Sequence, residues 1–205
     1  MKRINNIFYS LQGEGRNTGR AAVFIRFAGC NLRCSFCDTE FESYREMSDE
    51  DIVAEVEALS PRPSNLLKDA CCQGDARALR PLIVLTGGEP TLQVDEAFVD
   101  LLHQHDYEVA MESNGTRFAP RNLDWLTVSP KQSPIRQHCN EVKVIFVDAE
   151  HVPDIELEAD YYYLQPCDVG DAERNKAITQ ACVEYIKQHP QWRLSLQTHK
   201  LIDIE

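Results

Sequence analysis

The sequence lacks the features that would place the protein in a membrane, in a secretory pathway or on a nucleic acid. No apolar run approaches the roughly 18 residues of a membrane-spanning helix, and the first residues, MKRINNIFYSLQGEG, contain no apolar core of signal-peptide length. We therefore expect a cytoplasmic protein. Positive charge is scarce, with 21 Lys and Arg against 33 Asp and Glu and a net charge of −12. This balance disfavours binding to the polyanionic backbone of a nucleic acid.

Internal repeats and low-complexity tracts are absent as well. The chain has 205 residues, of which 43% are hydrophobic and 26% are charged. These values are ordinary for a globular protein and predict a single domain, residues 1–205, with a substantial core. Residues 60–80 interrupt the pattern with a polar stretch containing PRPSN and CCQGDARA, which we interpret as an inserted surface segment.

Short apolar runs rich in β-branched residues alternate with helical patterns along the chain. This alternation is typical of an α/β protein with a mostly parallel sheet. Because a complete eightfold barrel usually needs about 250 residues, seven strands in 205 residues predict a partial (β/α) barrel. The predicted strands are residues 22–27, 82–85, 107–111, 125–128, 142–147, 161–165 and 193–197, and the predicted helices are residues 49–59, 94–105 and 172–189.

Polar peptides, several of which contain glycine, follow the predicted strands. They read AGCNLRCSFCDT, TGGEP, ESNGT, SPK, QPCD and QTHK in chain order. In parallel α/β folds the carboxyl ends of the strands share one face, and functional sites are built there. The sequence therefore predicts one site made from six loops.

Eight cysteines are more than packing needs in a reducing compartment, where they more often bind metals or take part in catalysis. Cys30, Cys34 and Cys37 form a C-x3-C-x2-C pattern, whereas the other five are scattered. Three thiolates on one loop can hold three corners of a [4Fe-4S] cluster and leave one iron open. The alternatives are a zinc site completed by a distant residue, or free thiols. A zinc site usually has a second ligand pair, which this sequence does not show.

Taken in order, FYSLQGEG, RFAGCNLRCSFCDT, TGGEP, ESNGT, SPK, QP and QTHK resemble the radical S-adenosylmethionine (SAM) superfamily and, within it, the 7-carboxy-7-deazaguanine synthase family. The resemblance runs from Ile7 to the C-terminus, apart from residues 60–80. It implies a partial barrel of radical SAM type that converts 6-carboxy-5,6,7,8-tetrahydropterin to 7-carboxy-7-deazaguanine, with loss of ammonia, in queuosine and 7-deazapurine biosynthesis. It also implies a [4Fe-4S] cluster with three Cys ligands, SAM, Mg²⁺, a flavodoxin-type or other reductant, and a homodimer.

The resemblance implies which loops hold SAM. Gly88 and Glu89 of TGGEP occupy the positions that bind its amino group in the superfamily. Without the resemblance, TGGEP is a strand-to-helix turn, and the prolines of SPK and QPCD merely end strands. Cys167 is expected to be a small buried side chain rather than a fourth cluster ligand, because SAM needs the open iron. The expected SAM-binding residues are Phe36, Cys37, Asp38, Gly88, Glu89, Ser129, Pro130, Lys131, Gln165, Pro166, Cys167 and Asp168.

The substrate would meet a second set of residues. Arg26 interrupts an apolar strand, and its guanidinium would pair with the substrate carboxylate, although an internal salt bridge is the rival interpretation. The resemblance implies that Thr39 binds a Mg²⁺ ion and that Glu112 faces the pterin as a candidate catalytic residue. Without the resemblance, Thr39 would be interpreted as the cap of a turn. His199 could equally be a core histidine, and the LQGEG segment a plain turn. The expected substrate-binding residues are Leu11, Gln12, Gly13, Glu14, Arg26, Thr86, His199 and Glu205.

Two other functions remain open at the level of the sequence. One is another small radical SAM enzyme, such as an activase that acts on a glycyl-radical protein. The other is a module without enzymatic activity that carries an electron-transfer iron-sulfur cluster or a zinc ion.

Overall fold

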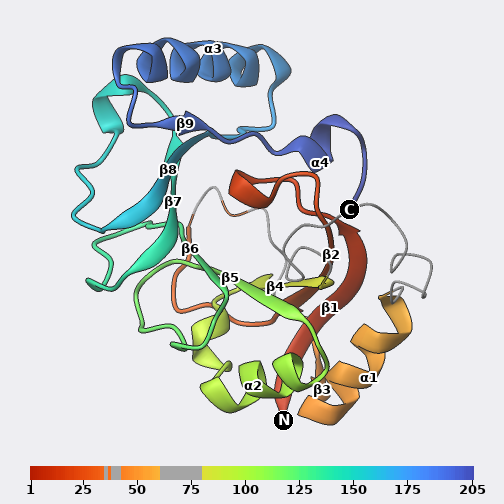
Figure 1. Cartoon of the computed structure of the whole chain (residues 1–205). Helices are drawn as coiled ribbons and strands as arrows, with labels where there is room; N and C mark the ends of the chain where they lie inside the picture. Colours follow the sequence, from red (N-terminus) through yellow and green to blue (C-terminus); the bar gives the residue numbers. More distant parts are fainter. Residues whose placement is uncertain (35–36, 38–42, 61–79) are drawn as a thin grey trace, which may run out of the picture.

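The computed structural model describes residues 1–34, 37, 43–60 and 80–205, and in these residues the strands form one nine-stranded sheet (Figure 1). The strand order is β3-β1-β2-β4-β5-β6-β7-β8-β9. The strands are β1 (Lys2–Leu11), β2 (Ala21–Phe27), β3 (Arg45–Met47), β4 (Leu82–Gly87), β5 (Glu108–Ser113), β6 (Trp125–Val128), β7 (Cys139–Phe146), β8 (Ala159–Pro166) and β9 (Arg193–Leu194).

The strands from β2 to β9, with β3 excepted, pair in parallel, so the mostly parallel sheet is confirmed. The sequence analysis missed β1 and β3, which pair antiparallel. Two asparagines in the middle of β1 and a bulge between Ile4 and Asn6 hide the alternation that marks a strand. The LQGEG segment begins at Leu11, the last residue of β1, and continues into the turn that follows this strand. The last predicted strand is shorter than expected and ends at Leu194.

Three helices cover the outer, convex face of the curved sheet (Figure 1). They are α1 (Asp49–Leu59), α2 (Glu96–Gln104) and α3 (Ala172–Gln188). Each begins after a side chain that accepts a hydrogen bond from a backbone N–H of the first turn: Ser48, Asp95 and Asp171. The remaining helical turns are η1 (Gly15–Asn17), η4 (Pro90–Leu92), η5 (Ala149–His151) and α4 (Thr198–Leu201). The three predicted helices are confirmed, α1 with the same bounds.

The two faces of the sheet have different surroundings. On β2, Val23, Ile25 and Phe27 point outward into the main core beneath the helices. The alternate residues point inward, where Ala22 joins Leu82, Val84 and Ala110 in a smaller apolar cluster. Burial of this kind stabilises the fold by roughly 1.5–3 kcal/mol for each large apolar side chain. The inward positions beyond the smaller cluster carry mostly polar side chains, among them Arg26, Thr86 and Glu112, and they line the site.

The sheet does not close on itself, which agrees with a partial barrel. After β9 the chain returns to β1. The Thr198 N–H donates to the Gly13 carbonyl at 2.9 Å, and the Ser10 hydroxyl donates to the Glu205 carbonyl at 2.6 Å. The C-terminal segment is thereby attached to β1 and to the turn that follows it.

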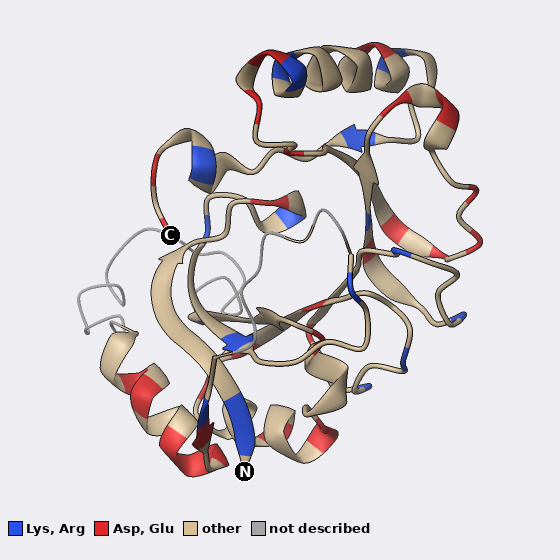
Figure 2. Ribbon diagram, turned by 180° about the vertical axis from the view of Figure 1, so that it is seen from behind, with Lys and Arg blue, Asp and Glu red and all other residues tan. Residues whose placement is uncertain are grey.

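The helix α1 is strongly acidic. Figure 2 shows acidic residues along α1, whose sequence DEDIVAEVEAL places three of them in the first turn. There they interact favourably with the helix dipole. Among the described residues, no helix is long and apolar enough to cross a membrane.

Candidate functional site

A pocket of about 620 Å³ lies at the carboxyl ends of the parallel strands. Loops after β2, β4, β5, β6 and β8, the turn after β1 and the C-terminal segment all contribute to it, so the predicted loops lie together on one face. The predicted site residues that line it are Leu11, Gln12, Gly13, Glu14, Arg26, Cys30, Cys34, Cys37, Thr86, Gly88, Glu112, Ser129, Lys131, Gln165, Pro166, Cys167, Asp168, His199 and Glu205. Glu89 and Pro130 do not line it, and Phe36, Asp38 and Thr39 lie outside the described residues.

The cysteine loop brings its three thiols to the rim of this pocket. The Cys37 N–H donates to the Cys34 carbonyl at 3.2 Å, which turns the loop. Cys30 Sγ accepts from the Leu32 N–H at 3.4 Å and from Asn114 Nδ2 at 3.8 Å. Burial raises the pKa of the Cys30 thiol. Three soft donors on one loop fit the iron corners of a cluster, and N–H donors to sulfur are the kind of contact that tunes one.

The TGGEP loop packs directly on the cysteine loop. The Gly88 N–H donates to the Phe27 carbonyl at 2.8 Å, and the Glu89 N–H donates to the Gly29 carbonyl at 2.9 Å. A Cβ atom at Gly88 would lie 2.0 Å from the Gly29 oxygen. Only glycine allows this approach, so the two loops are held in contact by backbone alone.

Glu89 is completely buried behind that contact. Its Oε1 accepts from the hydroxyls of Thr91 and Ser113, and its Oε2 accepts from the Asn114 N–H at 2.7 Å. The carboxylate also accepts from the Thr91 N–H and so caps η4. TGGEP is therefore also the strand-to-helix turn that its sequence suggests. Glu89 ties the loops after β4 and β5 together. Its contact with the amino group of SAM stays a prediction.

Arg26 faces the pocket from β2, next to an aromatic pair. Phe8 and Phe24 stack with ring centroids 4.9 Å apart, and the Arg26 guanidinium lies 4.7 Å from the Phe8 centroid. Its distance to Glu205 Oε1 is 3.8 Å, at the outer limit of an ion pair. The rival internal salt bridge is thus present but long, and the guanidinium still lines the pocket.

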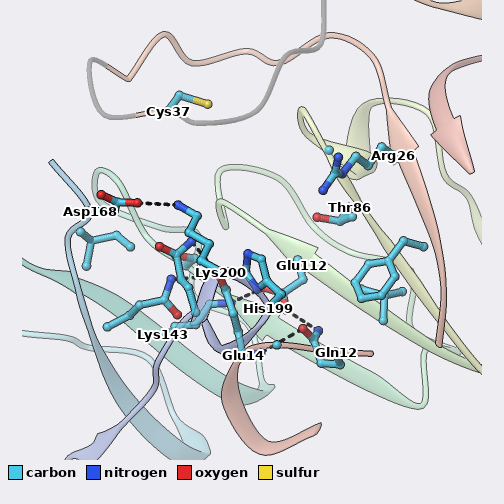
Figure 3. A pocket seen from close by; sticks show the side chains of 18 of the residues that line it. Gln12, Glu14, Arg26, Cys37, Thr86, Glu112, Lys143, Asp168, His199 and Lys200 are labelled. Carbon is cyan, nitrogen blue, oxygen red and sulfur yellow. Dashed lines mark hydrogen bonds and ion pairs between the residues drawn. The ribbon is translucent and has the colours of Figure 1, made fainter. Parts of the chain in front are cut away.

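The floor of the pocket is a cluster of polar side chains (Figure 3). Lys143 Nζ donates to Glu14 and, at 2.8 Å, to Glu112. Gln12 Nε2 donates to Glu112 at 3.3 Å, and Gln12 Oε1 accepts from the Glu14 N–H at 3.1 Å. Figure 3 shows Cys37 on the far side of the pocket from this floor.

Glu141 lies beneath the floor and is almost completely buried. Its Oε2 accepts from the Arg16 N–H at 2.9 Å. Burial, helped by the negative charge of Glu112, raises the pKa of the Glu141 carboxyl to about 7. This carboxyl is consequently protonated in a large fraction of molecules at neutral pH.

The later loops close the pocket from the side of β8. Lys131 Nζ donates to the Ser129 hydroxyl at 2.6 Å, and desolvation lowers the pKa of this lysine. Asp168 forms a 2.9 Å ion pair with Lys200, which with other hydrogen bonds lowers the pKa of the carboxyl to about 2. Cys167 is buried, as expected for a small side chain.

His199 packs against Gly13. A Cβ atom at Gly13 would lie 2.2 Å from Nδ1 of His199. His199 lines the pocket instead of lying in the core.

Sequence reasoning missed several lining residues, among them Phe8, Phe24, Asn114, Lys143, Gln197 and Lys200. Phe8 lies on the strand that was not recognised. Lys143 is the single charge in the run VKVIF, and the same argument that singled out Arg26 would have found it.

Comparisons with known proteins agree with this geometry. The family model of the radical SAM superfamily matches residues 24–188. The chain is 46% identical to the 7-carboxy-7-deazaguanine synthase of Bacteroides thetaiotaomicron, over 100% of this chain and 99% of the relative. It is 39% identical to the protein of the same name from Caulobacter vibrioides, over 98% of each chain. The crystal structure of QueE from Escherichia coli superimposes with a TM-score of 0.69 at 25% identity, covering 95% of this chain and 93% of that one.

The contact between the TGGEP loop and the cysteine loop can be tested with Gly88→Ala. We expect the anaerobically reconstituted variant to lose more than half of its bound iron and to unfold at a lower temperature, because the new methyl collides with a backbone oxygen. Gly19→Ala is the control. Alanine at Gly19 strains the backbone, because Gly19 has a φ of +85°, but its Cβ meets nothing within 4 Å, so this variant is a control for iron binding alone. Equal iron contents in the two variants would contradict the assignment.

The raised pKa of Glu141 predicts a pH-dependent stability. Between the ordinary value of 4.5 and about 7, the folded state keeps a proton that the unfolded chain releases. The contribution of this proton to the free energy of unfolding is therefore complete below pH 4.5 and is lost as the pH rises to about 7. Relative to Glu141→Gln, the free energy of unfolding should fall by up to about 1.4 kcal/mol per pH unit in that window. The free energies come from denaturant titrations at several pH values. If those of wild type and Glu141→Gln change in parallel with pH, the prediction is refuted.

Proposed function

Because the chain belongs to the radical SAM superfamily and, within it, to the 7-carboxy-7-deazaguanine synthase family, we propose that it converts 6-carboxy-5,6,7,8-tetrahydropterin to 7-carboxy-7-deazaguanine and ammonia. This is a lyase step in queuosine and 7-deazapurine biosynthesis. The observation that carries the proposal is the pocket itself, which is lined by the three cysteines, by Arg26 and by the polar floor, with Cys37 across from that floor in Figure 3. The full-length relatives favour this reaction over a glycyl-radical activase.

The residues around the cysteine loop fit a cluster and SAM. When bound, the reduced cluster and SAM supply the one-electron chemistry that removes a hydrogen atom from the substrate. Cys30, Cys34 and Cys37 would hold the cluster, and the Gly88 backbone lies against their loop. The loops with Ser129, Lys131, Gln165 and Asp168 surround the same space and would bind SAM. The protein's part is to position the reactants and to exclude water.

Charge orients the substrate in this proposal. The floor carries two carboxylates against one ammonium, so it repels the substrate carboxylate. Arg26 offers that carboxylate a bidentate partner on the pocket wall. The flat heterocycle would then lie near the Phe8 and Phe24 rings. Gln12, Thr86 and His199 line the same part of the pocket in Figure 3 and would contact it.

Finer features of the proposal follow from the family. We propose that a single iron is left without a cysteine ligand, that Thr39 binds Mg²⁺, and that the enzyme is a cytoplasmic homodimer served by a flavodoxin-type reductant. Thr39 lies outside the described residues. Cys167 supports the ligand count, because it is buried and its Sγ lies 3.8 Å from the Asp168 carbonyl. Iron loss in Cys167→Ala, or equal Mg²⁺ stimulation of wild type and Thr39→Ala, would contradict these assignments.

Anaerobic turnover tests the proposed function directly. Reconstituted protein with SAM, a reductant and 6-carboxytetrahydropterin should release 7-carboxy-7-deazaguanine and ammonia in equal amounts. Iron and sulfide analysis should give about four of each per chain. Zinc without sulfide, or a loaded cluster that cleaves SAM but leaves the pterin unchanged, would refute the proposal.

Arg26→Gln tests the orientation of the substrate. A hydrogen bond to a charged group contributes roughly 1.5–3 kcal/mol, so the KM for the pterin should rise about ten- to a hundredfold. The KM for SAM should change little, because the SAM loops lie elsewhere in the pocket. Arg45→Gln, which breaks an exposed pair with Glu55 outside the pocket, is the control. An unchanged pterin KM in folded Arg26→Gln would sink the assignment.

A further inference from the structure

Lys143 is the most enclosed charge in the floor of the pocket. Its side chain is 4% exposed, whereas those of its partners Glu14 and Glu112 are 18% and 19% exposed. Burying an ammonium costs several kcal/mol unless it is paired and hydrogen-bonded. The two ion pairs offset that cost, and Lys143 lines the pocket together with both carboxylates.

Three separate segments meet at this ammonium. Lys143 projects inward from β7, with Glu141 and Ile145 on the same face of the strand. Glu112 reaches it from β5, two strands away, and Glu14 reaches it from the turn after β1. Gln165 and Gln197 donate to the other oxygen of Glu14, each at 3.1 Å. The lysine therefore fixes the distance between two carboxylates that no backbone pairing connects.

The lysine also fixes the charge of the floor. Burial alone would raise the pKa of Glu14, but the attraction and the hydrogen bond of Lys143 outweigh it, and the pKa is lowered. The surrounding charged and titratable groups are Glu112, Glu141, Lys131 and His199. An ionised carboxylate accepts hydrogen bonds and donates none. The floor consequently presents neighbouring acceptors to whatever lies on it.

We propose that Lys143 is a positioning residue that makes the pocket selective for a heterocycle with adjacent N–H donors on its edge. The inference rests on the proposed function and deepens it. A 2-amino-4-oxopyrimidine ring has such an edge, formed by its exocyclic amine and a ring N–H. The 2-oxo analogue places an acceptor oxygen where the amine was, opposite a carboxylate. A site built to accept from an N–H rejects an analogue that lacks it, since a buried polar group is then left unpaired.

The experiment compares 6-carboxytetrahydropterin with 6-carboxytetrahydrolumazine, its 2-oxo analogue, on the cluster-loaded enzyme with SAM. Wild type should prefer the pterin at least about a hundredfold in kcat/KM. Lys143→Met removes the ammonium from which both carboxylates accept, so their oxygens are no longer held opposite the donors of the ligand. We expect the pterin KM to rise about ten- to a hundredfold and the preference to fall at least about tenfold. Lys143→Arg, which keeps the charge, should retain most of the preference.

The matched control is Lys187→Met, which breaks a Lys–Glu pair of the same chemistry on the surface of α3. Should Lys143→Met fold poorly, the double variant Glu14→Gln, Lys143→Met carries the test. The double variant removes one positive and one negative charge together. The amide introduced by Glu14→Gln can donate a hydrogen bond where the carboxylate only accepted, so the preference for the pterin should fall here too.

Folded Lys143→Met that loads its cluster and prefers the pterin as strongly as wild type would overturn the inference. Wild-type enzyme that cleaves SAM but turns over neither heterocycle would instead overturn the proposed function. The two failures are therefore distinguishable, because the first requires an active wild type. A loss of activity toward both heterocycles in equal proportion would show a merely structural role and would also overturn the inference.

Discussion

The site depends on one constraint, which is that the pairing of β2 and β4 continues beyond the ends of the strands. Phe27 and Gly87 are the last partners in register, and beyond them the Gly88 N–H donates to the Phe27 carbonyl and the Glu89 N–H to the Gly29 carbonyl. The cysteine loop is thereby seated on the TGGEP loop, while buried Glu89 links that loop to the one after β5. Three adjacent strand ends are thereby joined, and Glu89, which makes the second link, does not itself line the pocket.

Charge is distributed unevenly across the pocket although the whole chain is acidic. Lys131 and Arg26 line the walls, and the surplus of carboxylates lies at the floor. A ligand that has a carboxylate at one end and N–H donors at the other fits this arrangement in only one orientation, with the carboxylate toward the basic side chains and the donors toward the floor. The net charge of −12 does not reveal this, because the acidic residues along α1 lie on the outside (Figure 2).

The elements that could be predicted from the sequence were those with strong local signals. Ser48 and three acids specify the start of α1, and apolar runs specify the parallel strands. The C-x3-C-x2-C spacing located the pocket. β1 escaped because its inward residues are partly polar, and that polarity serves the site. Neither the link from Glu89 to the loop after β5 nor the pairing of Lys143 with Glu112 could be derived from local sequence, since the partners lie 24 and 31 residues apart.

Lys143 and Glu141 show how one strand can carry buried charge at a tolerable cost. Both point inward from β7, two residues apart. Lys143 stays charged because two carboxylates surround it, whereas Glu141, which faces the negative charge of Glu112, is driven toward its neutral form. The floor is left with two carboxylates against one ammonium, an imbalance that desolvation makes expensive. Donors on a bound heterocycle would relieve this imbalance, so the electrostatics of the floor favour the ligand that the pocket is shaped to accept.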